Sequence, residues 1–233
     1  METTTTNTEQ AHYLDIFRET TVGRYLSKHE DAFINPYLDR AKHPCSLLDI
    51  ACGSGYFTLP LHDKAFQVVG IDLDDEALAV LRQKSSTVSL GLANAERMPF
   101  GNKSFDYILA IQCFEFLDSA LFLDECHRIL ANDGLLIFDF LNRKSYKWLL
   151  KRMTGRTDYL QHPSAGLSHL DVFTALETSG FHIENAIGYN WQPFTRNSNS
   201  TLVEIAASIE DMLHLEQFYQ ISPKILVAAR KVA

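Results

Sequence analysis

The stretch Leu47-Leu-Asp-Ile-Ala-Cys-Gly-Ser-Gly55 decides the fold of this 233-residue chain. Its apolar first half predicts a buried strand, and its two glycines predict a tight turn into a helix. At such a turn the backbone can approach a ligand closely, and the helix N-terminus offers unpaired N–H groups to a carboxylate or phosphate. Asp49 on the strand adds an acceptor to the same crevice. The stretch therefore predicts a ligand site.

A second acid and a missing glycine narrow the kind of ligand. Asp72 ends the next predicted strand, and a carboxylate at that position can bind the two hydroxyls of a ribose. The third glycine of the GxGxxG pattern is absent, because Tyr56, Phe57 and Thr58 follow Gly55. A pyrophosphate is therefore disfavoured, and with it a nicotinamide-dependent oxidoreductase.

Short apolar runs alternate with helical periodicity, which predicts a parallel sheet with helices on both faces. The expected strands are 46–50, 67–71, 88–92, 105–111, 135–140, 181–189 and 225–230. We expect one helix to start at Gly55 and others to be capped by Asp74, by Ser119 and by the capping box Ser168-x-x-Asp171; the Ser119 helix should stop at a turn over 132–134. The predicted fold class is α/β: a Rossmann-like, mostly parallel mixed sheet of seven strands with an N-terminal helical cap.

The same pattern gives an expected domain organisation. Residues 1–10 are predicted to be a polar, disordered tail, and 11–233 a single domain. The parts that we expect within it are an N-terminal helical lid at 11–43, a ligand-binding core at 44–140, a basic insertion at 141–166 and substrate-side elements at 167–233.

Composition argues against several classes of protein. A net charge of −8 is poorly suited to gripping nucleic acid. The chain has no apolar run of about 18 residues, and METTTTNTEQ has neither the basic nor the apolar region of a signal peptide, so we expect no transmembrane span and a cytoplasmic location. The four cysteines form no CxxC pair and the nine histidines no metal-ligand spacing, which predicts neither a disulfide scaffold nor a metal site.

One segment departs from the acidic trend. Between Leu141 and Thr157 there are six basic residues and no acid. They form either a solvated helix face or a cationic, Trp-containing surface over 142–153. Such a surface would engage an anionic or lipid-linked acceptor, or the head groups of a membrane as a peripheral contact.

From Leu47 through Gly134 the chain resembles the class I S-adenosylmethionine-dependent methyltransferases. The LLDIACGSG stretch is similar to the first motif of that family, and Val68–Leu78 (VVGIDLDDEAL) to the second. Asn94–Phe100 (NAERMPF) resembles the third motif, whose commoner form begins with Asp. Phe105-Asp106 and the stretch ECHRILANDG, which ends at Gly134, are also similar.

The resemblance implies S-adenosylmethionine as methyl donor, S-adenosylhomocysteine as product, and a role for each matching residue. Gly53 and Gly55 would lie against the methionine moiety, with Asp49 near its amino group, and Asp72 would bind the ribose hydroxyls. Further contacts are implied for Ala51, for Leu73, for Asn94 at the adenine amino edge, for the backbone N–H of Ala95, for Gln112 on the methionine side and for Tyr25 over the sulfonium.

Methyl transfer from a sulfonium is an in-line displacement, so the protein mainly supplies alignment and, for a hydroxyl or protonated amine, a base. Glu115, just beyond the fourth strand, and His169, near the start of a helix, are the candidate bases. Each has a plainer interpretation, Glu115 as a solvent-facing acid and His169 as a surface or capping residue. Tyr25, Tyr189 and Trp191 are expected to wall an apolar acceptor pocket beneath the lid.

The function predicted from sequence is methyl transfer to a small-molecule or lipid-like acceptor, with O-, N- and C-methylation left open. A catalytically silent S-adenosylmethionine-binding partner subunit is the first alternative, and a nicotinamide-dependent oxidoreductase the second. The sequence leaves the oligomeric state open.

Overall fold

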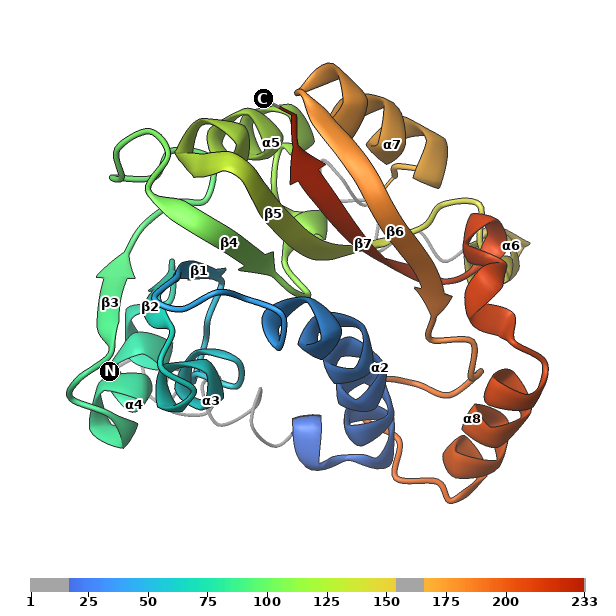
Figure 1. Ribbon diagram of the computed structural model, residues 1–233. Coiled ribbons are helices and arrows are strands. Elements are labelled where there is room, and N and C mark those ends of the chain that lie inside the picture. The colour runs from blue at the N-terminus through green and yellow to red at the C-terminus, as the bar shows by residue number, and fades with distance from the viewer. Residues whose placement is uncertain (1–16, 154–165, 233) are drawn as a thin grey trace, which may run out of the picture.

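The computed structural model describes residues 17–153 and 166–232, which form one twisted sheet with helices packed around it (Figure 1). Within these residues seven strands lie in the order β3-β2-β1-β4-β5-β7-β6. β7 runs antiparallel to β5 and β6, and the other pairs are parallel. The strands are β1 Ser46–Ile50, β2 Gln67–Asp72, β3 Ser89–Leu92, β4 Phe105–Ala110, β5 Leu130–Leu141, β6 Phe181–Tyr189 and β7 Lys224–Lys231. The predicted fold class is confirmed.

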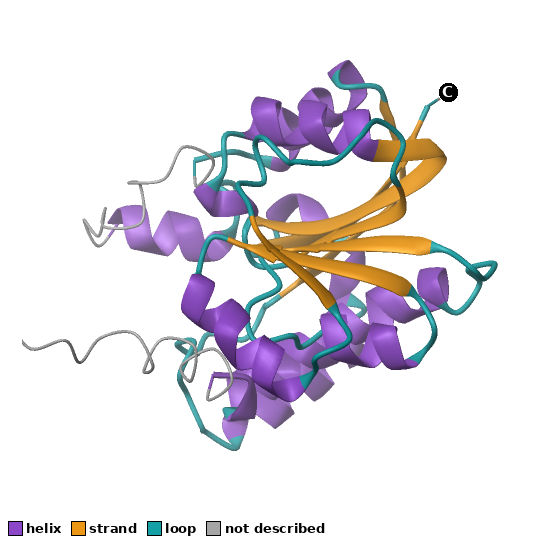
Figure 2. Ribbon diagram, turned by 90° about the vertical axis from the view of Figure 1, so that its left-hand side faces the viewer, coloured by secondary structure: helices purple, strands orange, loops and turns teal. Residues whose placement is uncertain are grey.

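Helices connect the strands and cover both faces of the sheet (Figure 2). They are α2 Thr21–Leu38, α3 Thr58–Asp63, α4 Asp75–Lys84, α5 Ser119–Ile129, α6 Tyr146–Met153, α7 His169–Thr178 and α8 Leu202–Met212, with 3-10 turns η1 Phe114–Phe116, η3 Leu215–Gln217 and η4 Tyr219–Ile221. No helix of the described ranges is long and apolar enough to cross a bilayer.

Local sequence signals place two of the predicted helix starts correctly. Asp74 caps α4, and Ser168 forms the predicted capping box with Asp171 at the start of α7. The prediction of Ser119 as a cap was wrong, because the Asp118 side chain accepts hydrogen bonds from the N–H groups of Ala120 and Leu121. The prediction of a helix from Gly55 was also wrong in its start, since α3 begins at Thr58.

The predicted turn over 132–134 is part of β5 instead. The chain enters the sheet directly after α5, with Leu130 paired to Phe105 of β4. The pairing shifts register before Tyr107 pairs with Leu135, so the Asn-Asp-Gly sequence lies in an irregular strand segment. Local turn residues were outweighed here by pairing with a neighbouring strand.

Alternate residues of each strand pack into two separate cores, as side-chain alternation requires. On one face Leu48 and Ile108 pack with residues of α5 and α7. On the other face Leu47 and Leu109 pack with Phe33 and Ile34 of α2 and with residues of α3 and α8. The helix α2, which falls within the predicted lid, is thus part of the core that covers the sheet.

Candidate active site

A cavity of about 300 Å³ opens at the carboxyl ends of β1, β2 and β4, where parallel α/β sheets bind ligands. We call it the donor cavity. Its lining includes Asp49, Ala51, Cys52, Gly53, Ser54, Asp72, Asp74, Ala77, Gln112 and Cys113. Phe17, Arg18, Tyr56, Phe57, Ile111, Phe116 and Arg196 close its other side. Five of the residues implied by the family resemblance, from three different strand ends, therefore meet around one space.

The carboxylate of Asp72 holds the glycine turn in place. Its Oδ2 accepts a hydrogen bond from the N–H of Gly53 at 2.8 Å, and its Oδ1 accepts one from the N–H of Asp74 at 2.9 Å. Gly53 has a φ of 52° and Ala51 a φ of 55°, so the backbone on both sides of Cys52 is left-handed. A carboxylate has about four lone-pair sites, which leaves Asp72 able to bind ribose hydroxyls as well.

The two glycines of the turn have different roles. Gly53 lines the donor cavity, whereas Gly55 does not. A Cβ placed on Gly55 would lie 2.3 Å from Cδ1 of Leu81 in α4, and its φ of 94° is one that side chains rarely adopt. Gly55 is therefore required for packing of the turn against α4, and its implied contact with methionine stays a prediction.

Asp49 is a buried carboxylate at the floor of the donor cavity. It is 3% exposed, and its Oδ2 accepts a hydrogen bond from the hydroxyl of Thr58 at 2.5 Å. Burial raises the pKa of Asp49 to about 7, although the Thr58 hydrogen bond opposes the shift. No ion pair to Asp49 occurs within residues 17–153 and 166–232. A ligand cation would supply the missing charge.

Gln112 connects the donor cavity to two other parts of the chain. It has a left-handed φ of 62°, and its N–H donates to Oδ1 of Asp139 in β5. Its side-chain amide donates to Oε1 of Glu30 in α2 at 2.7 Å and accepts from Nη2 of Arg196 at 2.9 Å. Gln112 thus links α2 to the loop after β6 rather than offering its amide to the cavity.

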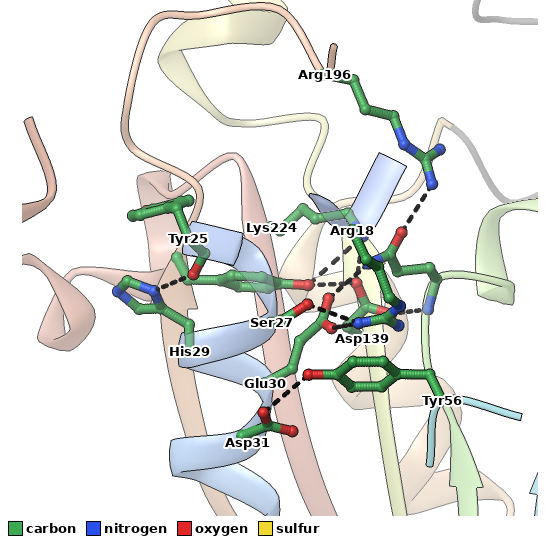
Figure 3. A network of polar contacts seen from close by, with 12 residues as sticks. Arg18, Tyr25, Ser27, His29, Glu30, Asp31, Tyr56, Asp139, Arg196 and Lys224 are labelled. Atoms are coloured by element: carbon green, nitrogen blue, oxygen red, sulfur yellow. Dashed lines mark hydrogen bonds and ion pairs between the residues drawn. The ribbon is translucent and has the colours of Figure 1, made fainter. Parts of the chain in front are cut away.

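The contacts of Gln112 with Asp139 and Glu30 join it to a buried charged network that also includes Lys224 (Figure 3). Lys224 at the start of β7 forms an ion pair with Asp139, and the hydroxyl of Tyr189 donates to Asp139 Oδ2 at 2.6 Å. Burial opposes the charge of Lys224, but the carboxylates of Asp139, Glu115 and Glu30 outweigh it and raise the pKa of the ammonium. Tyr189 is fully buried, so its predicted place in an acceptor pocket wall is replaced by a place in this network.

Arg18 joins this network to the rim of the cavity. Its Nη1 donates to the hydroxyl of Ser27 at 2.7 Å and pairs with Glu30 at 3.2 Å, while its guanidinium stacks 3.6 Å from the ring centre of Tyr56 (Figure 3). Burial raises the pKa of Glu30, and Arg18 opposes that shift. Arg18 thus connects Glu30 of α2 to the lining of the donor cavity.

Glu115 lies on η1, one turn after the strand β4. Its Oε2 is enclosed and accepts no hydrogen bond from the described residues. Burial raises the pKa of Glu115, with Lys224 acting against the shift and Asp139 adding to it. The solvent-facing interpretation of Glu115 is therefore wrong, since a carboxylate oxygen without a partner is enclosed beside the donor cavity.

Besides Gly55, four residues implied by the resemblance lie outside the lining of the donor cavity: Leu73, Asn94, Ala95 and Tyr25. The Asn94 side chain accepts from the N–H of Glu96, and Leu73 is exposed. The hydroxyl of Tyr25 contacts Glu210 and accepts from the N–H of Asn190, so it is directed away from the cavity. This corrects the implied position of Tyr25 over the sulfonium.

The second candidate base, His169, is not part of the lining of the donor cavity. His169 is buried at the start of α7, where its ring packs against Phe173 and Tyr219. Burial lowers its pKa.

Trp191 stacks on Tyr146 of α6, with ring centres 6.1 Å apart, and neither residue lines the donor cavity. Within the described ranges no cluster of three or more His, Cys, Asp or Glu could hold a metal ion.

Comparison with known proteins gives a consistent result. A family profile described as "Methyltransferase domain" matches residues 48–138. A probable S-adenosylmethionine-dependent methyltransferase of Mycolicibacterium smegmatis is 29% identical over 169 residues, covering 70% of this chain and 62% of that protein. A malonyl-[acyl-carrier protein] O-methyltransferase of Hamiltonella defensa is 30% identical over 44% of this chain and 40% of its own length. The chain thus spans less than two thirds of the curated relatives that it matches.

A solved structure extends the likeness in fold. Geranyl diphosphate C-methyltransferase from Streptomyces coelicolor, in complex with S-adenosyl-L-homocysteine, has a TM-score of 0.65 at 16% identity and covers 89% of this chain and 80% of its own. These matches identify residues 48–138 as a methyltransferase domain similar to those of the class I S-adenosylmethionine-dependent enzymes. The cofactor of the family is S-adenosylmethionine.

The donor cavity fits that cofactor. Asp72 is placed to bind a ribose, and the buried carboxylate of Asp49 lacks a cation that the ammonium of the methionine moiety would provide. Ala51 and Gly53 bring backbone close to the space between them. When bound, the cofactor supplies an already activated methyl group.

Replacing Asp72 with alanine should weaken binding of S-adenosylhomocysteine by about 2–3 kcal/mol, because hydrogen bonds to a charged acceptor are lost and Gly53 loses its anchor. Calorimetric titration measures the change. Glu76→Ala, a charge removal on the first turn of α4, is the control and should change the affinity little. Unchanged affinity of the Asp72 variant would show that the ribose binds elsewhere.

The affinity for S-adenosylhomocysteine should rise as the pH increases from about 6 to about 8, because the ligand ammonium favours ionised Asp49, whose pKa burial raises to about 7. The raised pKa also means that Asp49 stabilises the free fold below its unfolded pKa, and that this contribution is lost as the pH rises through 7. Asp49→Asn should flatten the pH dependence. 5′-Methylthioadenosine, which has no ammonium, should show none; an equal rise for both ligands would contradict the assignment.

Proposed function

We propose that this methyltransferase transfers a methyl group to a small-molecule or lipid-like acceptor and uses Glu115 as the general base. The observation that carries the proposal is the enclosed Oε2 of Glu115, a carboxylate oxygen without a hydrogen-bond partner within the described residues, on the turn that follows a strand bordering the donor cavity. An acceptor hydroxyl or amine would give this atom the proton donor that it lacks.

The buried charged network that Gln112 joins supports this role. Lys224 provides a positive charge that favours the ionised form of Glu115, against the burial that raises its pKa. Asp139 and Tyr189 hold Lys224 in place, and Gln112 joins them to the donor cavity. In the proposed reaction Glu115 takes a proton from the molecule that is methylated. Asp49, Gly53 and Asp72 hold the methyl donor in position for in-line attack.

The helix α6 and the loop after β6 suggest the chemical class of the methyl acceptor. The hydroxyl of Tyr146 donates to the Trp191 carbonyl, and Lys147 donates to Asn190 at 3.1 Å, which ties α6 to the loop after β6. On α6 Leu149 and Met153 are exposed beside basic residues. Such a helix would favour an amphiphilic acceptor with an anionic part, and a membrane contact over 142–153 stays a prediction.

The names of two similar proteins are consistent with an organic acceptor that has an anionic part. They are named for malonyl-[acyl-carrier protein] and for geranyl diphosphate. For this chain the acceptor and the methylated atom are open, and neither name decides between O- and C-methylation.

Two measurements test the proposal. Titration with S-adenosylhomocysteine and with NAD should show binding of the first only, and preferential binding of NAD would overturn the methyltransferase assignment. Incubation with methyl-labelled S-adenosylmethionine and a small-molecule extract should then transfer label to an organic-soluble product. Binding without any transfer would favour the alternative of a catalytically silent partner subunit.

A further inference from the structure

A second cavity, of about 450 Å³, lies between α2, β6, α8 and η3. It shares no lining residue with the donor cavity. Figure 3 shows why: His29 and Tyr25 project from one side of α2, and Arg18 with Tyr56 lies on the other. The proposed methyl transfer uses none of the residues around this second cavity.

The hydrogens around Tyr25 can be assigned from its partners. Its hydroxyl oxygen accepts from the N–H of Asn190 at 2.9 Å, so the hydroxyl hydrogen is donated to Oε2 of Glu210. Its carbonyl oxygen, which can only accept, lies 2.9 Å from Nδ1 of His29. Nδ1 must therefore carry a hydrogen, and because burial lowers the pKa of His29, Nε2 carries only a lone pair.

Nε2 of His29 faces a second hydrogen-bond acceptor that has no donor, Oε1 of Glu210. Oε1 of Glu210 lies 3.6 Å from Nε2 of His29, too far for a hydrogen bond between them even if the carboxyl were protonated. Oε1 accepts no hydrogen bond from the residues that the structure describes, although Glu210 is only 2% exposed. Both residues line the second cavity, whereas Tyr25 does not. A donor with at least two hydrogens is missing from this end of the cavity.

The surroundings favour a donor with positive charge. Asp211 and Glu216 line the same cavity as Glu210, which puts three carboxylates in its lining, one of them, Asp211, in an exposed pair with Lys28 at 3.3 Å. The basic side chain in the lining, Arg40, lies beyond the C-terminal end of α2, whereas His29 lies in the middle of that helix. Phe33 and Tyr37, whose ring centres are 5.7 Å apart, supply an aromatic wall between them.

We propose that this cavity binds a primary ammonium carried on an apolar body, with the ammonium bridging His29 Nε2 and Glu210 Oε1. A nitrogen about 2.9 Å from each of two acceptors that are 3.6 Å apart can direct one N–H to each, at ordinary hydrogen-bond length. The third N–H and the charge face the acidic side of the cavity. The apolar body lies along α2 against Phe33 and Tyr37.

The test uses the full chain with phenethylamine, and with 2-phenylethanol as a probe of the same shape without the charge. We expect phenethylamine to raise the melting temperature and to give a saturable calorimetric isotherm, and the alcohol to do neither. Equal effects of amine and alcohol would overturn the proposal. So would competition between the amine and S-adenosylhomocysteine, which would place the amine in the donor cavity.

Glu210→Gln is the decisive variant. Its amide oxygen can accept from Tyr25 and the substitution removes a buried negative charge, so the ligand-free protein should melt at the same or a higher temperature than the wild type. Its affinity for phenethylamine should fall at least about tenfold, as expected when one charged contact is removed. Glu204→Gln removes the same charge from an exposed position of α8 outside the cavity and should leave amine binding within about twofold.

Two further readouts keep the result unambiguous. In the wild type, the ¹⁵N shift of His29 Nε2 should move on addition of phenethylamine, and an unmoved shift would overturn the proposal even if the variant failed to fold. S-adenosylhomocysteine binding, measured on the same samples, reports on the donor cavity independently. Its presence together with loss of amine binding separates failure of this site from failure of the proposed methyl transfer.

Discussion

Lys224→Met is expected to lower the free energy of unfolding by about 3–5 kcal/mol, because it leaves the Asp139 carboxylate buried without its cation. Asp139 is fully buried and Lys224 is 6% exposed, so water cannot replace the lost charge. The hydrogen bonds that Asp139 accepts from Tyr189 and from the N–H of Gln112 satisfy its oxygens but not its charge. Urea unfolding at neutral pH measures the loss.

A second substitution separates charge from packing. In Lys224→Met/Asp139→Asn the buried charge is gone, while the amide oxygen can still accept from the N–H of Gln112, so most of the lost stability should return. Lys28→Met removes the cation of an exposed pair with Asp211 and should cost less than about 1 kcal/mol. If the double variant is no more stable than Lys224→Met, the loss comes from packing of the lysine stem, and the charge argument fails.

The cofactor side of the site was predictable because its residues follow one another along the chain. Asp49, Gly53 and Asp72 each lie at or just beyond the end of a strand, and parallel strands bring their carboxyl ends to one edge of the sheet. The strand–turn–helix order in the sequence is enough to place them. The separate roles of the two glycines were not predictable, because the reason for Gly55 is Leu81, a residue of the next helix.

The charged network beside the donor cavity was not predictable in the same way. Glu30, Gln112, Asp139, Arg196 and Lys224 come from five parts of the chain, and each is a single polar residue in an otherwise ordinary stretch. The one signal in the sequence was a charge inside an apolar run, Asp139 within the strand sequence LLIFDFL and Lys224 directly before ILVAA. A charge at a buried strand position requires a partner, but only the sheet order, with β7 inserted between β5 and β6, shows that the two meet.

The predicted N-terminal lid at 11–43 includes α2, which proves to be part of the core. This too could not be read from the sequence. The apolar stripe of α2 was visible, but a stripe does not say which surface it covers. In the structure it covers the sheet, with Phe33 and Ile34 in one core with Leu47 and Leu109. Of its polar residues, Glu30 then contacts Gln112 beside the donor cavity, whereas His29 lines the second cavity.

The effect expected on catalysis is larger than that on cofactor binding. Glu115→Gln should lower the rate of label transfer by a factor of about 10²–10⁴, the usual contribution of a positioned general base. The substitution keeps the size of the side chain and removes only the ability to take a proton. Affinity for S-adenosylhomocysteine should stay within about twofold, because Glu115 does not line the donor cavity.

The pH dependence distinguishes a base from a residue that only supports the fold. Burial raises the pKa of Glu115, so the wild-type rate should rise with pH as the carboxyl ionises, and the residual rate of Glu115→Gln should lack that rise. Glu96→Gln is a matched control outside the donor cavity: its carboxylate accepts from the N–H of Asp118, and it should keep the wild-type pH profile. A Glu115→Gln variant that transfers label at the wild-type rate would show that the acceptor loses no proton to Glu115, as would be expected for an acceptor that reacts without a base.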